Sequence, residues 1–309
     1  MNKQKPTVTI GIPAYNEEQN IFNLLQSVLR QKQNGFKIVE IILISDGSTD
    51  NTVNKVRKVK DKRLLIINNK KRDGKSVQLN KIFELAEGDI IVLFDADVVL
   101  YDSNTLHNLI KPIIKNRNVG LTGGYPVQSP TRNFLEQAIA IGNKAYEDAR
   151  YKFRNGNNVY CCIGQILALS KKFAKSLYVP ENVIANDNFM YFSCLSHNFK
   201  FEHAKSAKVL QRSPINLGDH FKQSERFITA RKRLKKLFGK LAENEYKMTS
   251  HLLFYYKLKA FIKNPIHCLT LFILNVYASI LAYKNRKKLN AVWSIAWSTK
   301  RRIRLSYDK

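Results

Sequence analysis

The chain of 309 residues carries 52 Lys and Arg against 24 Asp and Glu, which gives a formal net charge of +28 at pH 7. Its hydrophobic content of 44% excludes an intrinsically disordered chain, and its length allows one or two domains with a large core. The charge is uneven. Residues 200–309 hold 25 Lys and Arg against 6 Asp and Glu, a net charge of +19, and the first 199 residues hold the remaining +9. Nucleic acid or anionic lipid is therefore a candidate partner.

Short apolar runs in the first third predict four β-strands, at Val8–Pro13, Ile38–Ser45, Leu64–Asn68 and Ile90–Asp95. Amphipathic stretches between them predict helices near residues 17–31, 50–60 and 74–87. This alternation indicates an α/β fold with a mostly parallel sheet and helices on its faces. The run IVEIILI is typical of a strand buried on both faces.

Polar clusters follow these strands, at Ala14–Glu17, Ser45–Asp50, Asn69–Lys75 and Asp95–Asp97. Ligands of such sheets bind beyond the carboxyl ends of the strands, so we expect a site there. Asp95 and Asp97 share a face of the extended chain and repel each other unless a cation intervenes. A hard divalent ion would satisfy them, and the alternative is an Asp-rich turn that caps a helix.

Two further clusters carry groups suited to a polar or anionic ligand. In SDGSTDNT, Thr49 or Asp50 can cap the next helix, so Asp46 is left to contact a ligand. In KRDGKSVQLN, Arg72 and Lys75 stand close to a helix start, where anionic groups bind well.

The pieces VTIGIPAYNEEQNI, ILISDGSTDNT, RDGKSVQLN and VLFDADV, in this order and spacing, resemble the nucleotide-sugar domain of family 2 glycosyltransferases, which have the GT-A fold. The resemblance covers about residues 7–227, and Ser45 stands where the family often has the first Asp of D-D-G-S. It implies a nucleoside-diphosphate sugar donor, UDP-linked, with Asp46 near the base and Mg²⁺ or Mn²⁺ at Asp95 and Asp97. The donor-binding residues implied in this half are Pro13, Tyr15, Glu17, Asp46, Arg72, Lys75 and Asp95.

Residues 161–187 supply two further parts of the resemblance. CCIGQILALSKK resembles the glycine-bearing strand that faces the donor sugar, where Gly164 allows close approach; an ordinary core strand is the alternative. PENVIANDNFM resembles the element with the catalytic base, at Asp187. The alternative for Asp187 is a cap of a helix over Asn188–Ser196.

QSERF, thirty-six residues after Asp187, resembles the Q-x-x-R-W element of membrane-associated polymerising members. The resemblance implies that Gln223 and Arg226 bind the donor diphosphate and that Phe227 binds the acceptor. Phe227 stands in the Trp position, so it keeps a stacking face and loses the indole N–H donor.

The sequence patterns after Arg226 predict membrane contact. Leu234, Leu237, Phe238 and Leu241 recur with helical spacing among basic residues, which suits an anionic lipid interface; a helix packed on its own domain is the alternative. Residues 264–283 carry no charged side chain and reach the length of a bilayer span, and AVWSIAWSTKRRIR resembles an interfacial segment. We expect attachment by one span or a shallow hairpin at the cytoplasmic face of the membrane, where activated sugars are made. The amino terminus has no apolar signal core, and the four cysteines lack metal-site spacing and indicate reduced thiols.

The sequence thus predicts a nucleotide-sugar-binding half (1–120), an acceptor-binding half of the same domain (121–215), basic amphipathic interface helices (216–262) and a membrane-associated tail (263–309). The predicted reaction is an inverting sugar transfer to a lipid-linked or polysaccharide acceptor, with Asp187 as general base. One alternative is a sugar nucleotidyltransferase, which needs a glycine-rich triphosphate loop where this chain has IPAYNEE. The other is a non-catalytic protein that binds nucleic acid or anionic lipid. Nucleic acid is the less favoured partner, because carboxylates gathered at strand ends repel phosphate.

Overall fold

The computed structural model describes residues 4–285 and 297–303. Its strands are β1 (Thr7–Ala14), β2 (Lys37–Ser45), β3 (Leu64–Asn68), β4 (Ile90–Phe94), β5 (Val99–Leu100), β6 (Val119–Gln128), β7 (Ile166–Ser170) and β8 (Lys200–Gln211). Its α-helices are α1 (Ile21–Leu29), α2 (Thr52–Arg57), α3 (Lys75–Leu85), α4 (Thr105–Lys115), α5 (Phe134–Lys152), α6 (Lys171–Ser176), α7 (Asn186–Ser196), α8 (Leu217–Phe238), α9 (Lys240–Glu245), α10 (Ser250–Lys263) and α11 (Pro265–Asn285).

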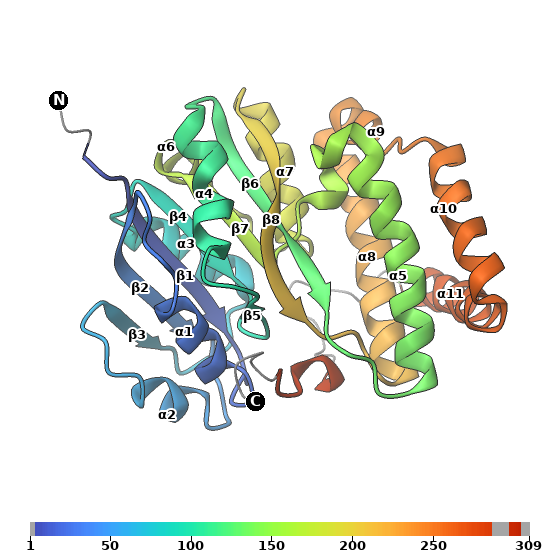
Figure 1. The fold of residues 1–309 in the computed structure, drawn as a ribbon, viewed down its shortest axis with the longest axis horizontal. Helices are drawn as coiled ribbons and strands as arrows, with labels where there is room; N and C mark the ends of the chain where they lie inside the picture. The colour runs from blue at the N-terminus through green and yellow to red at the C-terminus, as the bar shows by residue number, and fades with distance from the viewer. Residues whose placement is uncertain (1–3, 286–296, 304–309) are drawn as a thin grey trace.

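The strands form one mixed sheet in the order β3-β2-β1-β4-β7-β6-β8-β5, with helices on both faces (Figure 1). The first four strands in this order pair in parallel, and β7 runs antiparallel between β4 and β6. The α/β architecture with its four predicted strands is confirmed. Strands from residues 1–120 and 121–215 join in this single sheet, and the domain boundaries stay a prediction.

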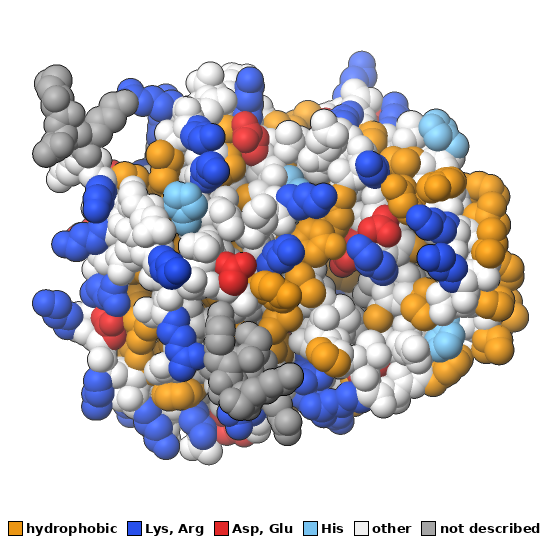
Figure 2. All heavy atoms as spheres, in the orientation of Figure 1, with side chains coloured by type: hydrophobic (Ala, Val, Ile, Leu, Met, Phe, Trp, Pro, Cys, Tyr) orange, Lys and Arg blue, Asp and Glu red, His pale blue; other side chains and the backbone are white. Residues whose placement is uncertain are grey.

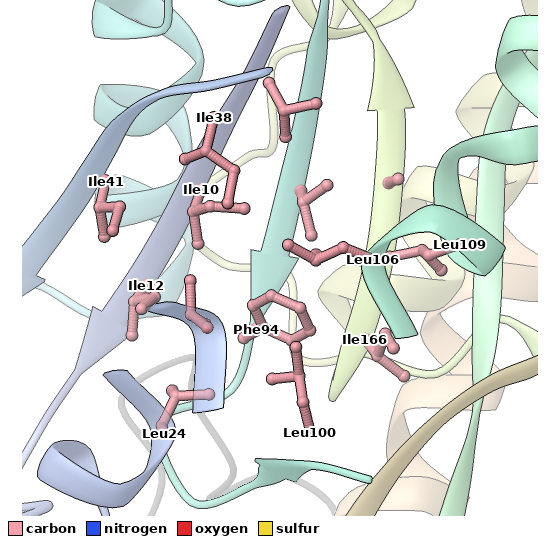
Figure 3. Packing of buried hydrophobic residues seen from close by; sticks show 14 of the residues in the cluster. Ile10, Ile12, Leu24, Ile38, Ile41, Phe94, Leu100, Leu106, Leu109 and Ile166 are labelled. Atoms are coloured by element: carbon pink, nitrogen blue, oxygen red, sulfur yellow. The ribbon is translucent and has the colours of Figure 1, made fainter. Parts of the chain in front are cut away.

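The core lies in two layers, one on each side of the sheet. On one side, Ile10 of β1 and Phe94 of β4 meet Leu24 of α1 and Leu106 of α4 (Figure 3). On the other side, α3, α6 and α7 pack against the alternate side chains of the same strands. Strand β2 contributes side chains to both layers and is buried on both faces, as its apolar run predicts. Each large apolar side chain buried in this way stabilises the fold by about 1.5–3 kcal/mol.

Helix α8 packs on its own domain through two of the apolar positions that were expected to face lipid, Leu234 and Phe238, while Leu237 is exposed. Leu234 is buried, and the ring of Phe238 lies 5.5 Å from that of Phe189 and 5.1 Å from that of Phe192 on α7. Gly239, with φ of 54°, ends α8 and places Leu241 in the next helix. The amphipathic lipid-facing helix predicted here is therefore not confirmed, because apolar periodicity specifies a face to be covered and not what covers it.

Helix α11 covers most of the uncharged stretch 264–283 and lies against α5 and α8 (Figure 1). Two of its polar side chains contact these helices: Asn275 Oδ1 lies 3.2 Å from His220 Nε2 on α8, and the His267 ring stacks on Phe134 of α5. In the part of the chain that the structure describes, no helix is long and apolar enough to cross a membrane, so the single span expected over 264–283 is not met. Trp293, in the expected interfacial segment, lies outside the described residues.

Candidate active site

The loop after β1 (residues 15–20) begins the site and is tied to the turn after β2. Pro13 lies beyond Gly11, where the pairing of β1 with β4 ends, so its missing N–H leaves no gap in that ladder. Asn16 takes a positive φ of 52°, a conformation that Asn tolerates. Its Oδ1 accepts a hydrogen bond from Thr49 N at 2.8 Å. This loop replaces the first turn of the helix expected from residue 17, and α1 starts at Ile21.

Asp46 is buried at the end of β2 and holds the segment that leads into α3. Its Oδ1 accepts from Asp73 N at 2.8 Å and Gln78 Nε2 at 2.7 Å, and its Oδ2 accepts from Gly74 N at 3.0 Å. Asp50 accepts from Thr52 N at 3.0 Å, but the N-cap position of α2 is Asn51, without a side-chain hydrogen bond, so neither Thr49 nor Asp50 is the N-cap residue. Asp46 thus orders the stretch that carries Arg72 and Lys75, a role that the sequence did not indicate.

Gly47 lets this stretch approach the turn after β2. Its φ is +69°, and a Cβ there would lie 2.8 Å from the backbone carbon of Lys71, closer than side chains tolerate. The approach brings the Arg72 guanidinium to 4.0 Å from the centroid of the Tyr15 ring. Two residues predicted to bind the donor therefore face each other in cation–π geometry.

Lys75, Asp95 and Asp187 meet around Gly164. Lys75 forms an ion pair with Asp95, and Gly164 N donates to Asp187 Oδ2 at 3.1 Å. A Cβ on Gly164 would lie 3.4 Å from Lys75 Nζ and 3.6 Å from Asp187 Oδ2. Gly164 itself lies in the turn before β7 and not within the strand where it was expected. The structure thus joins predicted donor-binding residues to the predicted base.

Asp187 lies in the first turn of α7 and does not cap that helix. The N-cap position is Ala185, without a side-chain hydrogen bond, while the Asp187 carboxylate accepts from Asn188 N at 2.8 Å. Burial raises the pKa of Asp187, and the Asn188 N–H, the Lys75 charge and the Gly164 N–H oppose the rise. A carboxyl group with a raised pKa is a stronger proton acceptor when ionised, which is what a general base requires.

A third carboxylate joins the Asp95/Asp97 pair in this region. Burial and the neighbouring Asp95 charge raise the pKa of Asp97, and burial and Asp97 raise that of Glu17. Lys300, which forms an ion pair with Glu17, opposes both shifts. Lys300 was missed in the sequence, because it lies in a basic run far from the other motifs.

The Asp95/Asp97 pair fits a hard divalent ion that keeps most of its coordination for a substrate. Among residues 4–285 and 297–303, no group of three or more His, Cys, Asp or Glu side chains is arranged to hold a metal. Mg²⁺ is ordinarily bound by one or two carboxylates together with substrate phosphates and water, so a pair suffices. Burial is the main cause of the raised pKa of Asp97, and the repulsion from Asp95 that adds to it is the kind that a bound cation relieves.

Helix α8 brings a guanidinium to the same carboxylates. Burial lowers the pKa of Arg226, and Asp187, Asp95 and Asp97 oppose the shift, so Arg226 lies within electrostatic reach of all three. Gln223 lies one turn earlier on the same side of α8. Phe227 is 59% exposed, with the Arg226 guanidinium 5.3 Å from its ring centroid.

The chain matches the description "Glycosyl transferase family 2" over residues 9–177, more than half of its length. The chain belongs to this family. It is 24% identical over 288 residues to the UDP-Glc:alpha-D-GlcNAc-diphosphoundecaprenol beta-1,3-glucosyltransferase WfgD of Escherichia coli, covering 91% of this chain and 98% of that protein. It is 22% identical over 218 residues to the uncharacterized glycosyltransferase MJ1057 of Methanocaldococcus jannaschii, covering 68% and 72%. The resemblance of residues 223–227 to Q-x-x-R-W stays a prediction.

Solved glycosyltransferase structures share the fold of this family 2 enzyme. The mannosyltransferase PcManGT of Pyrobaculum calidifontis, in complex with GDP-Man and Mn²⁺, superposes with a TM-score of 0.65 at 17% identity, covering 93% of this chain and 88% of that one. Glucosyl-3-phosphoglycerate synthase of Mycobacterium tuberculosis, with Mn²⁺ and UDP-glucose, gives 0.55 at 17% identity, covering 76% and 79%. The GT-A fold is confirmed, and membership of the glycosyltransferase family favours the glycosyltransferase over the two alternatives that the sequence left open.

Proposed function

We propose that this glycosyltransferase transfers a hexose from a nucleoside-diphosphate sugar, UDP-linked, to a lipid-linked or polysaccharide acceptor with inversion at the anomeric carbon. The observation that carries the proposal is the meeting of Lys75, Asp95 and Asp187 around Gly164, with Arg226 within electrostatic reach. Such a cluster offers a proton acceptor beside cationic groups suited to a leaving diphosphate. WfgD, whose name gives a UDP-glucose donor and a lipid diphosphate acceptor, supports the substrate class.

The donor groups divide by chemistry. Tyr15 and Arg72 offer a ring and a guanidinium for stacking on the base, and Asp46 holds the segment that carries Arg72. Lys75, Gln223 and Arg226 contact the diphosphate, since Lys and Arg donate charge-assisted hydrogen bonds to phosphate oxygens. Pro13 and Glu17 shape the loop that presents Tyr15.

Asp187 accepts the proton in the transfer step. The acceptor hydroxyl oxygen forms a bond to the anomeric carbon while the bond from that carbon to the diphosphate oxygen breaks. The hydroxyl proton passes to the Asp187 carboxylate, and the electron pair leaves with the nucleoside diphosphate. Gly164 N and Asn188 N, which donate to this carboxylate, orient it. Phe227, exposed on α8, provides a ring against which the acceptor stacks.

Asp95 and Asp97 would hold Mg²⁺ or Mn²⁺. When bound, such an ion supplies charge stabilisation to the departing diphosphate. The ion pair with Lys75 balances the negative charge of Asp95, one of these two carboxylates.

Helices α10 and α11 present the surface that we propose contacts an anionic membrane. Hydrophobic side chains gather along this edge of the molecule (Figure 2). Its most exposed apolar residues are Phe254, Tyr255, Ile262, Ile266, Phe272, Ile273 and Tyr283. A soluble monomer rarely exposes so many neighbouring apolar groups, which mark an interaction site. Exposed Lys257, Lys259 and Lys263 on α10 add charge for anionic headgroups. This arrangement supports peripheral attachment, and we propose the cytoplasmic face because activated sugars are made in the cytoplasm.

The test is incubation of the purified enzyme with a panel of UDP- and GDP-sugars, Mn²⁺ and a polyprenyl-diphosphate sugar acceptor. Release of nucleoside diphosphate together with an acceptor extended by one hexose is the expected result. Failure of every donor to bind or to be consumed would refute the proposal.

A further inference from the structure

The segment 297–303 joins the loop after β1 to the start of α8. Ser298 N donates to Asp219 Oδ2 on α8 at 2.8 Å. Ile303 is buried, and its N–H donates to Asn20 Oδ1 at 2.9 Å, directly before α1. The segment is therefore packed into the domain, between the part of the fold that carries Tyr15 and the helix that carries Arg226.

The Lys300 side chain holds three consecutive residues of the loop after β1. Its Nζ donates to the carbonyl oxygens of Tyr15 at 2.6 Å and Asn16 at 3.2 Å, and it forms an ion pair with Glu17. These contacts match the three N–H donors of an ammonium group. The side chain of Lys300 is 14% exposed and that of Glu17 is 7% exposed, so water replaces neither partner easily.

The charge of Lys300 also bears on an anionic ligand. The carboxyl groups of Glu17, Asp95 and Asp97 lie near one another at the end of the sheet where a diphosphate is proposed to bind. A buried carboxylate without a partner is costly, and a cluster of carboxylates repels phosphate. Lys300 compensates Glu17 and lowers the negative potential around Asp97.

We infer that Lys300 is a positioning residue of the donor site. It holds Tyr15 opposite Arg72 and compensates Glu17, so that the last part of the described chain completes the site formed by the first. The inference rests on the proposed function. It locates the effect of Lys300 in donor binding and not in the transfer step.

The test compares Lys300→Met, Lys300→Arg and the control Arg301→Met, an exposed neighbour in the same segment. In Lys300→Met, the donor Kd and KM should rise about tenfold or more, because a charged hydrogen-bonding group is lost, while kcat stays within about twofold. Lys300→Arg should recover much of the donor affinity, since a guanidinium can also pair with Glu17. Arg301→Met should match the wild type. Backbone amides of residues 15–20 should exchange hydrogen faster in Lys300→Met alone.

An unchanged donor KM in Lys300→Met, or a fall in kcat alone, would overturn the inference. If that variant does not unfold cooperatively, the substitution is made in a Glu17→Gln background, which leaves no unpaired buried charge. Donor binding must then still be weaker than in Glu17→Gln alone, and equal binding would overturn the inference. The exchange measurement needs no donor, so it tests the contact of Lys300 with the loop even if wild-type enzyme consumes no nucleotide sugar and the proposed function fails.

Discussion

Replacing Asp46 with Asn should loosen the segment that carries Arg72 and Lys75. The two carboxylate oxygens of Asp46 accept hydrogen bonds from the backbone N–H groups of Asp73 and Gly74 and from Gln78 Nε2. The substitution preserves the volume but turns one oxygen into an NH₂ group. An NH₂ group in place of Oδ1 faces Asp73 N and Gln78 Nε2 and removes their acceptor. An NH₂ group in place of Oδ2 faces Gly74 N and leaves it only the longer hydrogen bond of 3.3 Å to Oδ1.

The expected cost follows from these bonds. A hydrogen bond to a charged group contributes about 1.5–3 kcal/mol, and the bonds that remain lose their charge assistance, so the loss should be about 2–4 kcal/mol. For a chain of 309 residues, whose unfolding entropy is about 0.65 kcal/mol/K, that corresponds to a fall in Tm of about 3–6 °C. Donor affinity should fall as well, because the ordering of the segment must then occur on binding.

The assay is thermal unfolding followed by circular dichroism, with donor Kd measured by titration calorimetry. Asp73→Asn is the matched control, because its side chain is exposed and its backbone N–H still reaches Asp46. A Tm for Asp46→Asn within about 2 °C of the wild type, together with unchanged donor affinity, would refute the assigned role.

Three further outcomes are expected. Asp97→Asn should lower transfer by about 10²-fold or more and remove the metal dependence of donor binding with the fold retained; full activity of the wild type in excess chelator would contradict this. Burial raises the pKa of Asp187, and only its ionised form accepts a proton, so kcat/KM should fall as the pH drops through a value above the usual aspartate range. A fall of kcat/KM only at the usual aspartate pKa would count against Asp187 as the base. Phe272→Glu should reduce binding to anionic vesicles without changing turnover of a soluble acceptor. The control Leu65→Glu, at an exposed residue of β3, should bind like the wild type, and equal binding by both variants would exclude α11 from the membrane contact.

The first four strands could be predicted because each is a short segment rich in apolar residues and followed by polar residues. The start of α1 could not, since residues 17–20 fit the helical pattern but form a loop fixed by tertiary hydrogen bonds of Asn16 and Glu17. Helix α8 shows the same limit: its apolar positions were visible in the sequence, but the packing of Phe238 on Phe189 and Phe192 was not.

The roles of single polar residues were less predictable than their places. Asp46 was expected at a strand end, yet its partners are backbone N–H groups of Asp73 and Gly74, which no sequence pattern marks. Lys300 is far from the other site residues in the sequence, and the basic run that contains it resembles any solvated segment. A salt bridge between residues 17 and 300 depends on the whole chain being folded.

The most direct test of the central claim is donor Kd and turnover measured on one preparation of Asp187→Asn. The variant keeps the size of the side chain and one oxygen, which can accept from Gly164 N or Asn188 N, and it removes the proton acceptor. Donor Kd should stay at the wild-type value while transfer falls by about 10²- to 10⁴-fold, the usual contribution of a positioned general base. Turnover near the wild-type rate would contradict the account and assign the base to another residue.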